Sequence, residues 1–487
     1  MTTTARERMT ARQLIELVLD PDSFESWDEP IDISGYAEKY QQELLRARER
    51  TGVDESVLTG RGTVHGRPVA FVVNEFGFLA GSIGRDAAQR IVTAIRRATA
   101  EGLPLLASTA SGGTRMQEGT PAFVRMVDIS RAIMDHRAAG LPYLVHLRHP
   151  TTGGVFASWG SLGHVTVAEP GALVGFLGPK VYETLYGDPF PSGVQVSENL
   201  ADRGIIDAVV SSAELPALVE RALGILLDEV EPSSRERRVL PDGVNGAVWD
   251  SVMRTRRPGR AGVRDVLRRG SDATLRLKGT DEGERDASML VALARLDGVP
   301  CVVVGQDRTK QTPASPMGPG ALREARRGMR LAEELGLPLV SIIDTPGAEL
   351  SKEAEEGAIA GEIARCIATM STLTVPTVSV LLGQGTGGGA LALLPANVVV
   401  AAQHSWLSPL PPEGASAIVY GDIDHAEELA RRQQIGAADL HANGVVRQIV
   451  AEPEGDTPEG LADAVAAEIG HWLRQLTSDR ARAQAQR

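Results

Sequence analysis

Three glycine-rich turns hold the residues whose types and spacing best suit chemistry. They are residues 111–113 (SGG), 152–154 (TGG) and 385–390 (GTGGGA), and each lies between an apolar stretch and a run of small residues. Such a turn exposes backbone N–H groups, and the missing Cβ atoms let a ligand oxygen approach closely. Removing one donor of this kind typically costs about 3 kcal/mol in a reaction barrier. The turns therefore indicate stabilisation of oxyanions, unless their glycines only let helices and strands pack closely.

Other kinds of site find less support in the same residues. Residues 383–388 also match the dinucleotide pattern G-x-G-x-x-G, but no acidic residue follows about twenty positions later, where the pattern requires one. Residues 160–163 lack the spacing of a nucleophilic serine elbow. The nine histidines show no paired spacing typical of metal ligands, although His149 precedes the second turn. We therefore predict no bound metal.

A basic segment lies in the second half of the chain. It contains Arg254, Arg256, Arg257, Arg260, Arg264, Arg268 and Arg269. Guanidinium groups form paired hydrogen bonds with phosphates, so the segment is a candidate site for a polyphosphate ligand such as coenzyme A. A solvated face or a subunit contact would use the same residues, and the sequence leaves these alternatives open.

The elements that must position the turns occur twice. Pro104 and Pro142 each precede an apolar stretch, and Pro338 and Pro376 repeat their separation along the chain. In each half an amphipathic helical pattern that ends at a glycine precedes the first of these stretches, and a second helical pattern follows it. Apolar stretches bounded by helices are typical of buried, largely parallel sheets. The fold class is therefore α/β, with an internal duplication.

The chain divides into an arm and two domains. Residues 1–55 are charged and helical in pattern, and we interpret them as an N-terminal arm. The first domain spans residues 56–232 and the second residues 247–476, because residues 231–246 between them are polar and rich in turn formers. We expect the residues after position 476 to form a frayed, charged tail.

Composition limits the partners. The 487 residues carry a formal net charge of −13, which would repel a phosphate backbone, so we expect no nucleic acid partner. Two cysteines cannot form a disulfide framework or a four-thiolate zinc site. No apolar run is long enough to span a membrane, and the first residues lack an apolar signal core. These features predict a cytoplasmic protein with no membrane partner.

Several longer phrases resemble the carboxyltransferase of bacterial acetyl-CoA carboxylase. Residues 110–118, 149–158 and 168–180 resemble its β subunit, and residues 343–348, 387–392 and 408–414 resemble its α subunit, in order. The resemblance covers residues 55 to about 450. It implies two tandem crotonase-like (ClpP/crotonase) domains, the first for acyl-CoA and the second for biotin.

The resemblance also implies roles for individual residues. Gly153 and Gly154 would donate to the thioester oxygen, and Gly389 and Ala390 to the ureido oxygen of biotin. The implied substrate-binding residues are Gly112, Gly113, Lys180, Gly388 and Ala392. Ala392 borders the acyl pocket in this scheme, and alanine there is typical of acetyl-type enzymes. The expected reaction carries a carboxyl group from carboxybiotin to the α carbon of acetyl-CoA and yields malonyl-CoA.

This reaction requires partners. The chain has no Met-Lys-Met biotinylation site, so biotin must arrive on a biotin carboxyl carrier protein that a biotin carboxylase has loaded. In the family the active site forms between protomers, which implies a dimer or a higher homo-oligomer. Residues 349–352 depart from the usual glycine-rich continuation, on the biotin side. Two alternatives remain: a biotin-independent decarboxylase of malonyl thioesters, and a non-catalytic scaffold subunit.

Overall fold

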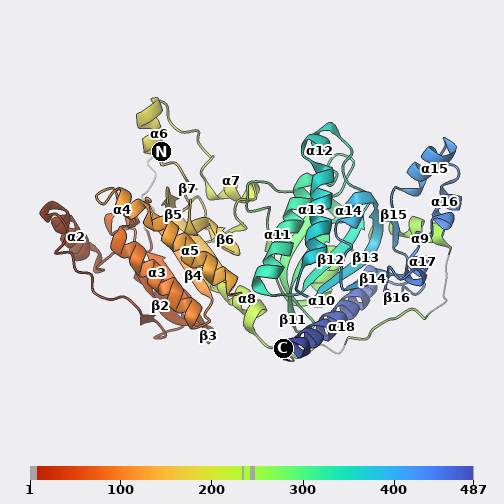
Figure 1. Ribbon diagram of the computed structural model, residues 1–487, viewed down its shortest axis with the longest axis horizontal. Coiled ribbons are helices and arrows are strands. Elements are labelled where there is room, and N and C mark those ends of the chain that lie inside the picture. The colour runs from red at the N-terminus through yellow and green to blue at the C-terminus, as the bar shows by residue number, and fades with distance from the viewer. Residues whose placement is uncertain (1–7, 233–234, 242–246, 486–487) are drawn as a thin grey trace. The chain divides into compact units, whose positions relative to one another are not determined.

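The computed structural model describes residues 8–232, 235–241 and 247–485, and it divides into two compact units (Figure 1). Unit 1 comprises Met1–Leu223 and unit 2 comprises Gly224–Arg487. The division falls within helix α8 (Leu215–Leu227), ahead of the predicted linker. Part of that linker, residues 233–234 and 242–246, lies outside the described residues.

Unit 1 is a twisted sheet covered by helices. Its strands are β1 (Glu25–Ser26), β2 (Val57–Val64), β3 (Arg67–Asn74), β4 (Leu105–Ser111), β5 (Tyr143–Thr152), β6 (Val165–Ala168), β7 (Val174–Gly175) and β8 (Ala208–Val209). The order is β1-β2-β3-β4-β5-β6-β8, with β7 beside β5, and the sheet is parallel from β3 onward. Its helices before α8 are α1 (Ala11–Val18), α2 (Glu38–Thr51), α3 (Arg85–Ala100), α4 (Thr120–Phe123), α5 (Arg125–Ala138), α6 (Pro179–Tyr186) and α7 (Ser197–Asp202).

Unit 2 repeats this plan. Its strands are β9 (Ser271–Leu277), β10 (Met289–Leu296), β11 (Val299–Gln306), β12 (Leu339–Thr345), β13 (Thr377–Thr386), β14 (Val398–Ala402), β15 (Trp406–Ser408) and β16 (Gln448–Val450). The order is β9-β10-β11-β12-β13-β14-β16, with β15 beside β13. Its helices are α9 (Val248–Thr255), α10 (Val263–Gly270), α11 (Pro319–Leu335), α12 (Lys352–Glu356), α13 (Ile359–Thr372), α14 (Gly387–Leu391), α15 (Pro412–Tyr420), α16 (Ala426–Arg432), α17 (Ala437–Ala442) and α18 (Pro458–Ala485).

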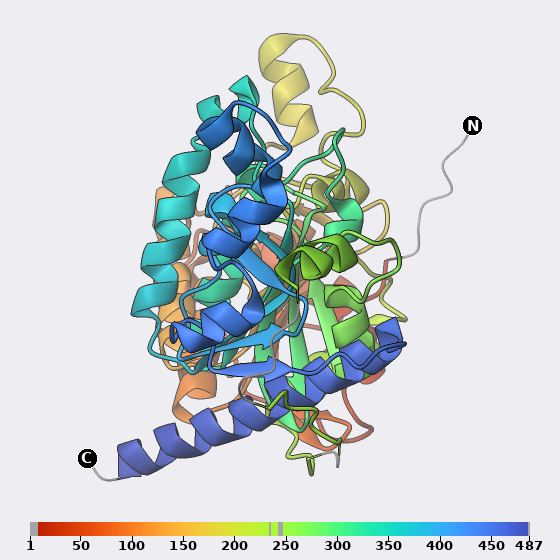
Figure 2. The same cartoon turned by 90° about the vertical axis from the view of Figure 1, so that its right-hand side faces the viewer.

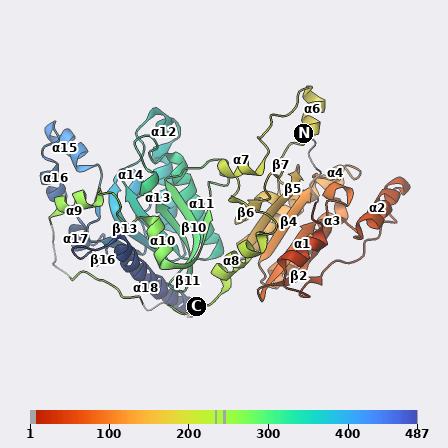
Figure 3. The ribbon, with the colours of Figure 1, turned by 180° about the vertical axis from the view of Figure 1, so that it is seen from behind.

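Helices cover both faces of each sheet. In unit 2 a Cβ atom at Gly328 of α11 would meet Val304 of β11. A Cβ atom at Gly305, the next residue of β11, would meet Val263 of α10. Because neighbouring residues of a strand point to opposite faces, α11 and α10 lie on opposite sides of the sheet. In unit 1, α3 and α5 lie in front of the sheet in Figure 1. Helix α1 lies on the opposite face, which Figure 3 shows from behind. This is the α/β class that the sequence predicts.

The duplication extends to single residues. The N-cap glycines of α3 and α11, Gly84 and Gly318, share φ −89° and ψ −177°. The glycines after the long strands β5 and β13, Gly153 and Gly387, have φ +62° and +65°, a left-handed conformation that favours glycine. The same backbone therefore places the same turn at the same strand end in both units, and the predicted duplication is confirmed.

The C-terminal end differs from the prediction. Helix α18 continues through Ala485, so the expected frayed tail after Leu476 is wrong (Figure 2). The helix buries Ala462, Val465 and Ile469 in the core of unit 2, and Leu476 is packed against that core. Its charged last turns extend a helix already fixed by this apolar face. None of the helices in the described part of the chain is both long and apolar enough to cross a membrane.

The N-terminal segment belongs to the body of unit 1. The amide of Ala11 donates to Glu75 Oε2 over 2.8 Å, and the hydroxyl of Tyr40 donates to Glu118 Oε1 over 2.7 Å. Arg115, which follows the first glycine turn, is 1% exposed and donates to Glu55 Oε2 over 2.8 Å. A buried ion pair thus ties the turn to the start of β2.

We expect Arg115→Met to lower the free energy of unfolding by about 3 to 5 kcal/mol, because it leaves the buried Glu55 without a counter-charge. Arg125 forms an exposed pair with Asp128, so Arg125→Met should change stability by no more than about 1 kcal/mol. Urea unfolding at one fixed protein concentration, followed by tryptophan fluorescence, measures both. Equal effects of the two substitutions would contradict a stabilising role of the buried pair.

Candidate active site

The two glycine turns of unit 1 lie against each other. Strands β4 and β5 are parallel neighbours, with Ser111 opposite Thr151, so their turns leave the sheet at the same edge. Gly113 has φ +103°, and a Cβ atom there would lie 3.3 Å from the Thr152 carbonyl oxygen and 3.4 Å from the Gly154 nitrogen. The structure therefore brings the two predicted turns together, and the close contact requires glycine at position 113.

Most amides of these turns are already hydrogen-bonded. The Gly112 amide donates to the Ala80 carbonyl over 2.9 Å, and the Gly113 amide donates to Ser111 Oγ over 3.0 Å. The Gly153 amide donates to the carbonyls of Gly175 and Phe176 over 3.1 and 3.0 Å. Among the residues that the structure describes, the Gly154 amide has no hydrogen-bond partner. Gly154 is thus the free donor of the predicted pair.

An apolar cavity of about 670 Å³ adjoins the second turn. Phe156, Phe176 and Phe190 line it, together with Gly175, whose carbonyl accepts the Gly153 amide. The apolar part of this lining suits an acyl or pantetheine chain, and Gln195, Asn199 and Arg203 add polar groups to it. Lys180 is the second residue of α6, and its side chain lies outside the described part of the structure.

In unit 2 the third turn forms the first part of α14. Gly387, Gly388 and Gly389 are the first three residues of this helix, after the N-cap Thr386. The N–H groups at the start of a helix have no partner within it, so these three amides form a cluster of donors. Ala390 is the fourth residue, where the helical i to i−4 bonding begins. Ala392 follows the helix and is fully buried.

The loop after β12, around Gly347, packs against the glycines at the start of α14. Gly347 has φ +132°, and a Cβ atom at Gly389 would clash with the Met317 methyl group and lie 3.4 Å from the Ala348 nitrogen. The loop that departs from the family pattern folds back here, because the Glu349 amide donates to the Met317 carbonyl over 2.9 Å. Leu350 points outward and is 95% exposed.

Two buried polar residues lie behind α14: Gln306 carries no motif and was missed by the sequence analysis, whereas Asp344 lies in the phrase 343–348 but was given no role there. Gln306 ends β11 and is fully buried, and Asp344 in β12 is 1% exposed. Asp344 Oδ1 accepts the Gln384 amide over 3.0 Å. Burial raises the pKa of Asp344 to about 6. A polar residue at the end of an otherwise apolar strand was the available signal for both.

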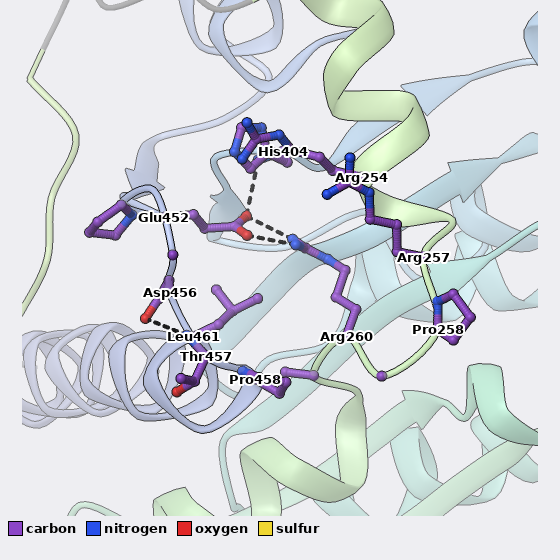
Figure 4. Close-up of a pocket in the computed structure, with 14 residues that line it drawn as sticks. Arg254, Arg257, Pro258, Arg260, His404, Glu452, Asp456, Thr457, Pro458 and Leu461 are labelled. Carbon is purple, nitrogen blue, oxygen red and sulfur yellow. Dashed lines mark hydrogen bonds and ion pairs between the residues drawn. The ribbon is translucent and has the colours of Figure 1, made fainter.

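The arginine segment serves mainly to hold unit 2 together. Five of its seven side chains form ion pairs: Arg256 with Glu413, Arg260 with Glu452, Arg264 with Asp307, Arg268 with Asp265 and Arg269 with Asp463. Arg254 and Arg257 line a cavity of about 300 Å³ beside His404 (Figure 4). Burial, the largest cause, lowers the pKa of His404. The polyphosphate interpretation stays a prediction, and it now concerns only these two arginines.

No group of three or more metal-ligating side chains lies together in the described ranges. His149 lies in β5 rather than in a loop, and its Nδ1 atom accepts the Leu173 amide over 3.0 Å, which is a structural role.

Comparison with known proteins gives one consistent family. A family model described as a carboxyl transferase domain matches residues 2–466. The chain is 58% identical over 476 residues to the probable biotin-dependent acyl-coenzyme A carboxylase beta3 subunit of Mycobacterium tuberculosis, covering 96% of this chain and 95% of that protein. It is 36% identical over 494 residues to the acetyl-coenzyme A carboxylase carboxyl transferase subunits beta/alpha of Saccharopolyspora erythraea, covering 97% and 87%.

Solved structures agree on the fold. The chain is similar to transcarboxylase 12S, a hexamer solved with methylmalonyl-coenzyme A and methylmalonic acid bound. The TM-score is 0.77 at 21% identity, over 97% of this chain and 90% of that one. A single-chain, multi-domain long-chain acyl-CoA carboxylase gives a TM-score of 0.73 at 20% identity, over 96% and 46%. Two duplicated α/β units with glycine turns at the strand ends define the class of paired crotonase-like proteins. Within that class, the chain belongs to the carboxyl transferase domain family, which includes the beta subunits of biotin-dependent acyl-CoA carboxylases.

The buried Asp344 predicts a pH-dependent stability. Because its folded-state pKa is raised to about 6, the cost of ionising it is absent at acid pH and is fully present above that pKa. The isosteric Asp344→Asn keeps the acceptor for Gln384 and removes this cost. We expect the stability of the variant relative to the parent to increase by about 2 kcal/mol between pH 4.5 and pH 7.5. Urea unfolding of both proteins at the two pH values measures the change, and a difference independent of pH would contradict it.

Proposed function

We propose that the chain is the carboxyltransferase component of a biotin-dependent acetyl-CoA carboxylase. It would transfer the carboxyl group of carboxybiotin to the α carbon of acetyl-CoA and release malonyl-CoA. The observation that carries the proposal is that each unit presents backbone amides at the same strand end. In unit 1 the Gly154 amide has no hydrogen-bond partner among the described residues, and in unit 2 the amides of residues 387–389 begin α14 and so have no partner within that helix. Family membership agrees with this chemistry.

In this proposal unit 1 binds the acyl-CoA. The Gly154 amide donates to the thioester oxygen and stabilises the negative charge that develops on this oxygen when the α proton leaves. No side-chain base is needed in this scheme. The Gly153 amide, which is engaged with the carbonyls of Gly175 and Phe176, holds the turn rather than the substrate. Gly112 and Gly113 shape the adjoining wall, and the phenylalanine-lined cavity receives the apolar part of the thioester.

Unit 2 receives biotin in the same proposal. Carboxybiotin supplies the carboxyl group and, after CO2 has left it, the base for the α proton. The amides of Gly388 and Gly389 fit the ureido oxygen, because they belong to the first turn of α14 and a helix start favours negative charge. The family resemblance implies the same role for the Ala390 amide. Because Ala390 is the fourth residue of α14, its amide is in position for the first i to i−4 hydrogen bond of that helix, and in this proposal it supports the helix rather than binds biotin.

Acetyl-CoA is the proposed substrate because the family resemblance places Ala392, a small residue, at the acyl pocket of unit 1, which unit 2 of a second copy would complete. The Saccharopolyspora erythraea relative is named for acetyl-CoA, whereas the Mycobacterium tuberculosis relative is named only for acyl-CoA. A biotin carboxylase and a biotin carboxyl carrier protein are the proposed partners, and the proposed assembly is a homo-oligomer of at least two copies, in the cytoplasm. Transcarboxylase 12S, which shares the fold, is a hexamer.

We expect the purified protein to consume malonyl-CoA at an appreciable rate only when biocytin is present as the carboxyl acceptor. Gly389→Val should lower this turnover by about 100-fold or more, because its side chain must displace Met317 and block the donors. Chromatography of acetyl-CoA formed with and without biocytin gives both rates.

Gly262→Val is the matched control, because a Cβ atom at Gly262 meets nothing within 4 Å and φ there is −120°. It should keep the parental rate. Malonyl-CoA binding should survive in both variants. Equal rates with and without biocytin would contradict the carboxyltransferase assignment and favour a biotin-independent decarboxylase.

The substrate proposal makes a separate prediction. Enlarging Ala392 to Asp or Ile should change the ratio of kcat/KM values for acetyl-CoA and propionyl-CoA by about tenfold, the usual effect of one or two methylene groups in a pocket. Ala368→Ile, on the exposed face of α13, should leave the ratio unchanged. Competition between the two thioesters measures it, and an unaltered ratio in the Ala392 variants would show that this residue does not line the acyl pocket.

A further inference from the structure

Gln306 links the central sheet of unit 2 to the helix that carries the donors. It is the last residue of β11 and is fully buried. Its Oε1 atom accepts the backbone amide of Asp344 over 3.1 Å, and its Nε2 atom donates to the carbonyl of Gly389 over 2.8 Å. One neutral amide group thus satisfies a donor in β12 and an acceptor in α14 at the same time.

The contact occurs where the regular ladder is interrupted. The register between β12 and β13 shifts between Ile343 and Thr345, so the Asp344 amide lies at an irregularity of the sheet. The side chain of Gln306 accepts the hydrogen bond of the Asp344 amide. The Asp344 carboxylate in turn accepts the Gln384 amide. An unpaired amide buried here would cost about 1 to 3 kcal/mol. The side chain of Gln306 therefore completes the strand end from which α14 starts.

Helix α14 cannot fix its own orientation. It has five residues, and three of the five are glycines. Helices this short are unstable without tertiary contacts. All carbonyls of a helix point toward one end and all N–H groups toward the other. A bond that fixes the Gly389 carbonyl therefore also fixes the direction in which the amides of Gly387, Gly388 and Gly389 point.

We propose that Gln306 is a positioning residue for the donors of unit 2: by holding the Gly389 carbonyl, it aims the N-terminal amides of α14 at the biotin-side oxyanion. This inference rests on the proposed function for what the donors bind, but the orientation of α14 does not depend on that function. Gln306 acts through Gly389 and touches no reacting atom in this scheme.

The first unit offers an internal comparison. Asn74 ends β3, as Gln306 ends β11, but its amide nitrogen lies 3.4 Å from the carbonyls of Ser56 and Gly81 and makes no bond to a glycine turn after β5. The two buried amides occupy the same place in the duplicated fold and differ in what they hold. Asn74→Asp is therefore the matched control for an amide-to-acid change at Gln306.

Two variants test the proposal through turnover. Gln306→Glu is isosteric, and its side chain can donate to the Gly389 carbonyl only while protonated. Gln306→Leu has a similar volume and cannot donate at any pH. In biocytin-dependent consumption of malonyl-CoA, Gln306→Leu should lose at least tenfold in kcat/KM for biocytin throughout pH 6 to 9. Gln306→Glu should lose as much at pH 9 and recover toward the parent at pH 6.

The KM for malonyl-CoA should stay within twofold of the parent in both variants, and Asn74→Asp should show no loss specific to biocytin. Parental kcat/KM for biocytin in Gln306→Leu, or a ratio of Gln306→Glu to parent that does not change with pH, would overturn the proposal. A loss shared equally by both substrates would also overturn it, since that result indicates a general structural defect.

Hydrogen exchange gives a readout that needs no reaction. Mass spectrometry of the segment 383–394 at pH 8 should show exchange at least fivefold faster in Gln306→Leu than in the parent, with no change in Asn74→Asp. Unaltered exchange would overturn the positioning role even if turnover fell. If the parent has no biocytin-dependent turnover, the proposed function fails, and the exchange result still decides whether Gln306 holds α14.

Discussion

The left-handed glycine after the long strand of each unit is the constraint on which the rest of the site depends. At Gly153 and Gly387 the chain must leave the sheet with φ near +60°, a conformation that costs other residues about 1 kcal/mol or more. This turn ends the strand and directs the next amides away from the sheet. The neighbouring strands, the cap glycines and the buried polar groups all serve to keep that turn in place.

Duplication supplied two copies of this turn, and the two copies have since diverged in their surroundings. In unit 1 the turn borders three phenylalanines and an apolar cavity, and one of its amides is bonded to the last residue of β7 and to the residue that follows it. In unit 2 the turn begins a short helix that rests on Gln306 and Met317. An apolar surround suits a thioester chain, whereas the amides at the start of a helix suit an exocyclic carbonyl oxygen such as the ureido oxygen of biotin. The proposed division of labour follows from this difference.

Local patterns made much of the fold predictable. The helical spacing before Gly102 and Gly336, the repeated prolines and the glycine turns are all encoded within a few residues, and the structure has the corresponding helices, strands and duplication. The features that were missed depend on residues far apart in sequence. The partners of the Gly153 amide lie in residues 175–176, and the Gly389 carbonyl is held by a residue of β11. The arginines could not be assigned for the same reason, since Arg260 finds Glu452 only in the folded unit.

The central claim is that the free amide of Gly154 binds the thioester oxygen. A crystal structure of the protein with malonyl-CoA and biocytin tests it most directly. The account predicts the thioester carbonyl oxygen within hydrogen-bonding distance, about 3 Å, of the Gly154 nitrogen, with the acyl chain beside the cavity of the three phenylalanines. A thioester bound in unit 2, or one in unit 1 whose carbonyl oxygen faces solvent while the Gly154 amide stays unpaired, would contradict it.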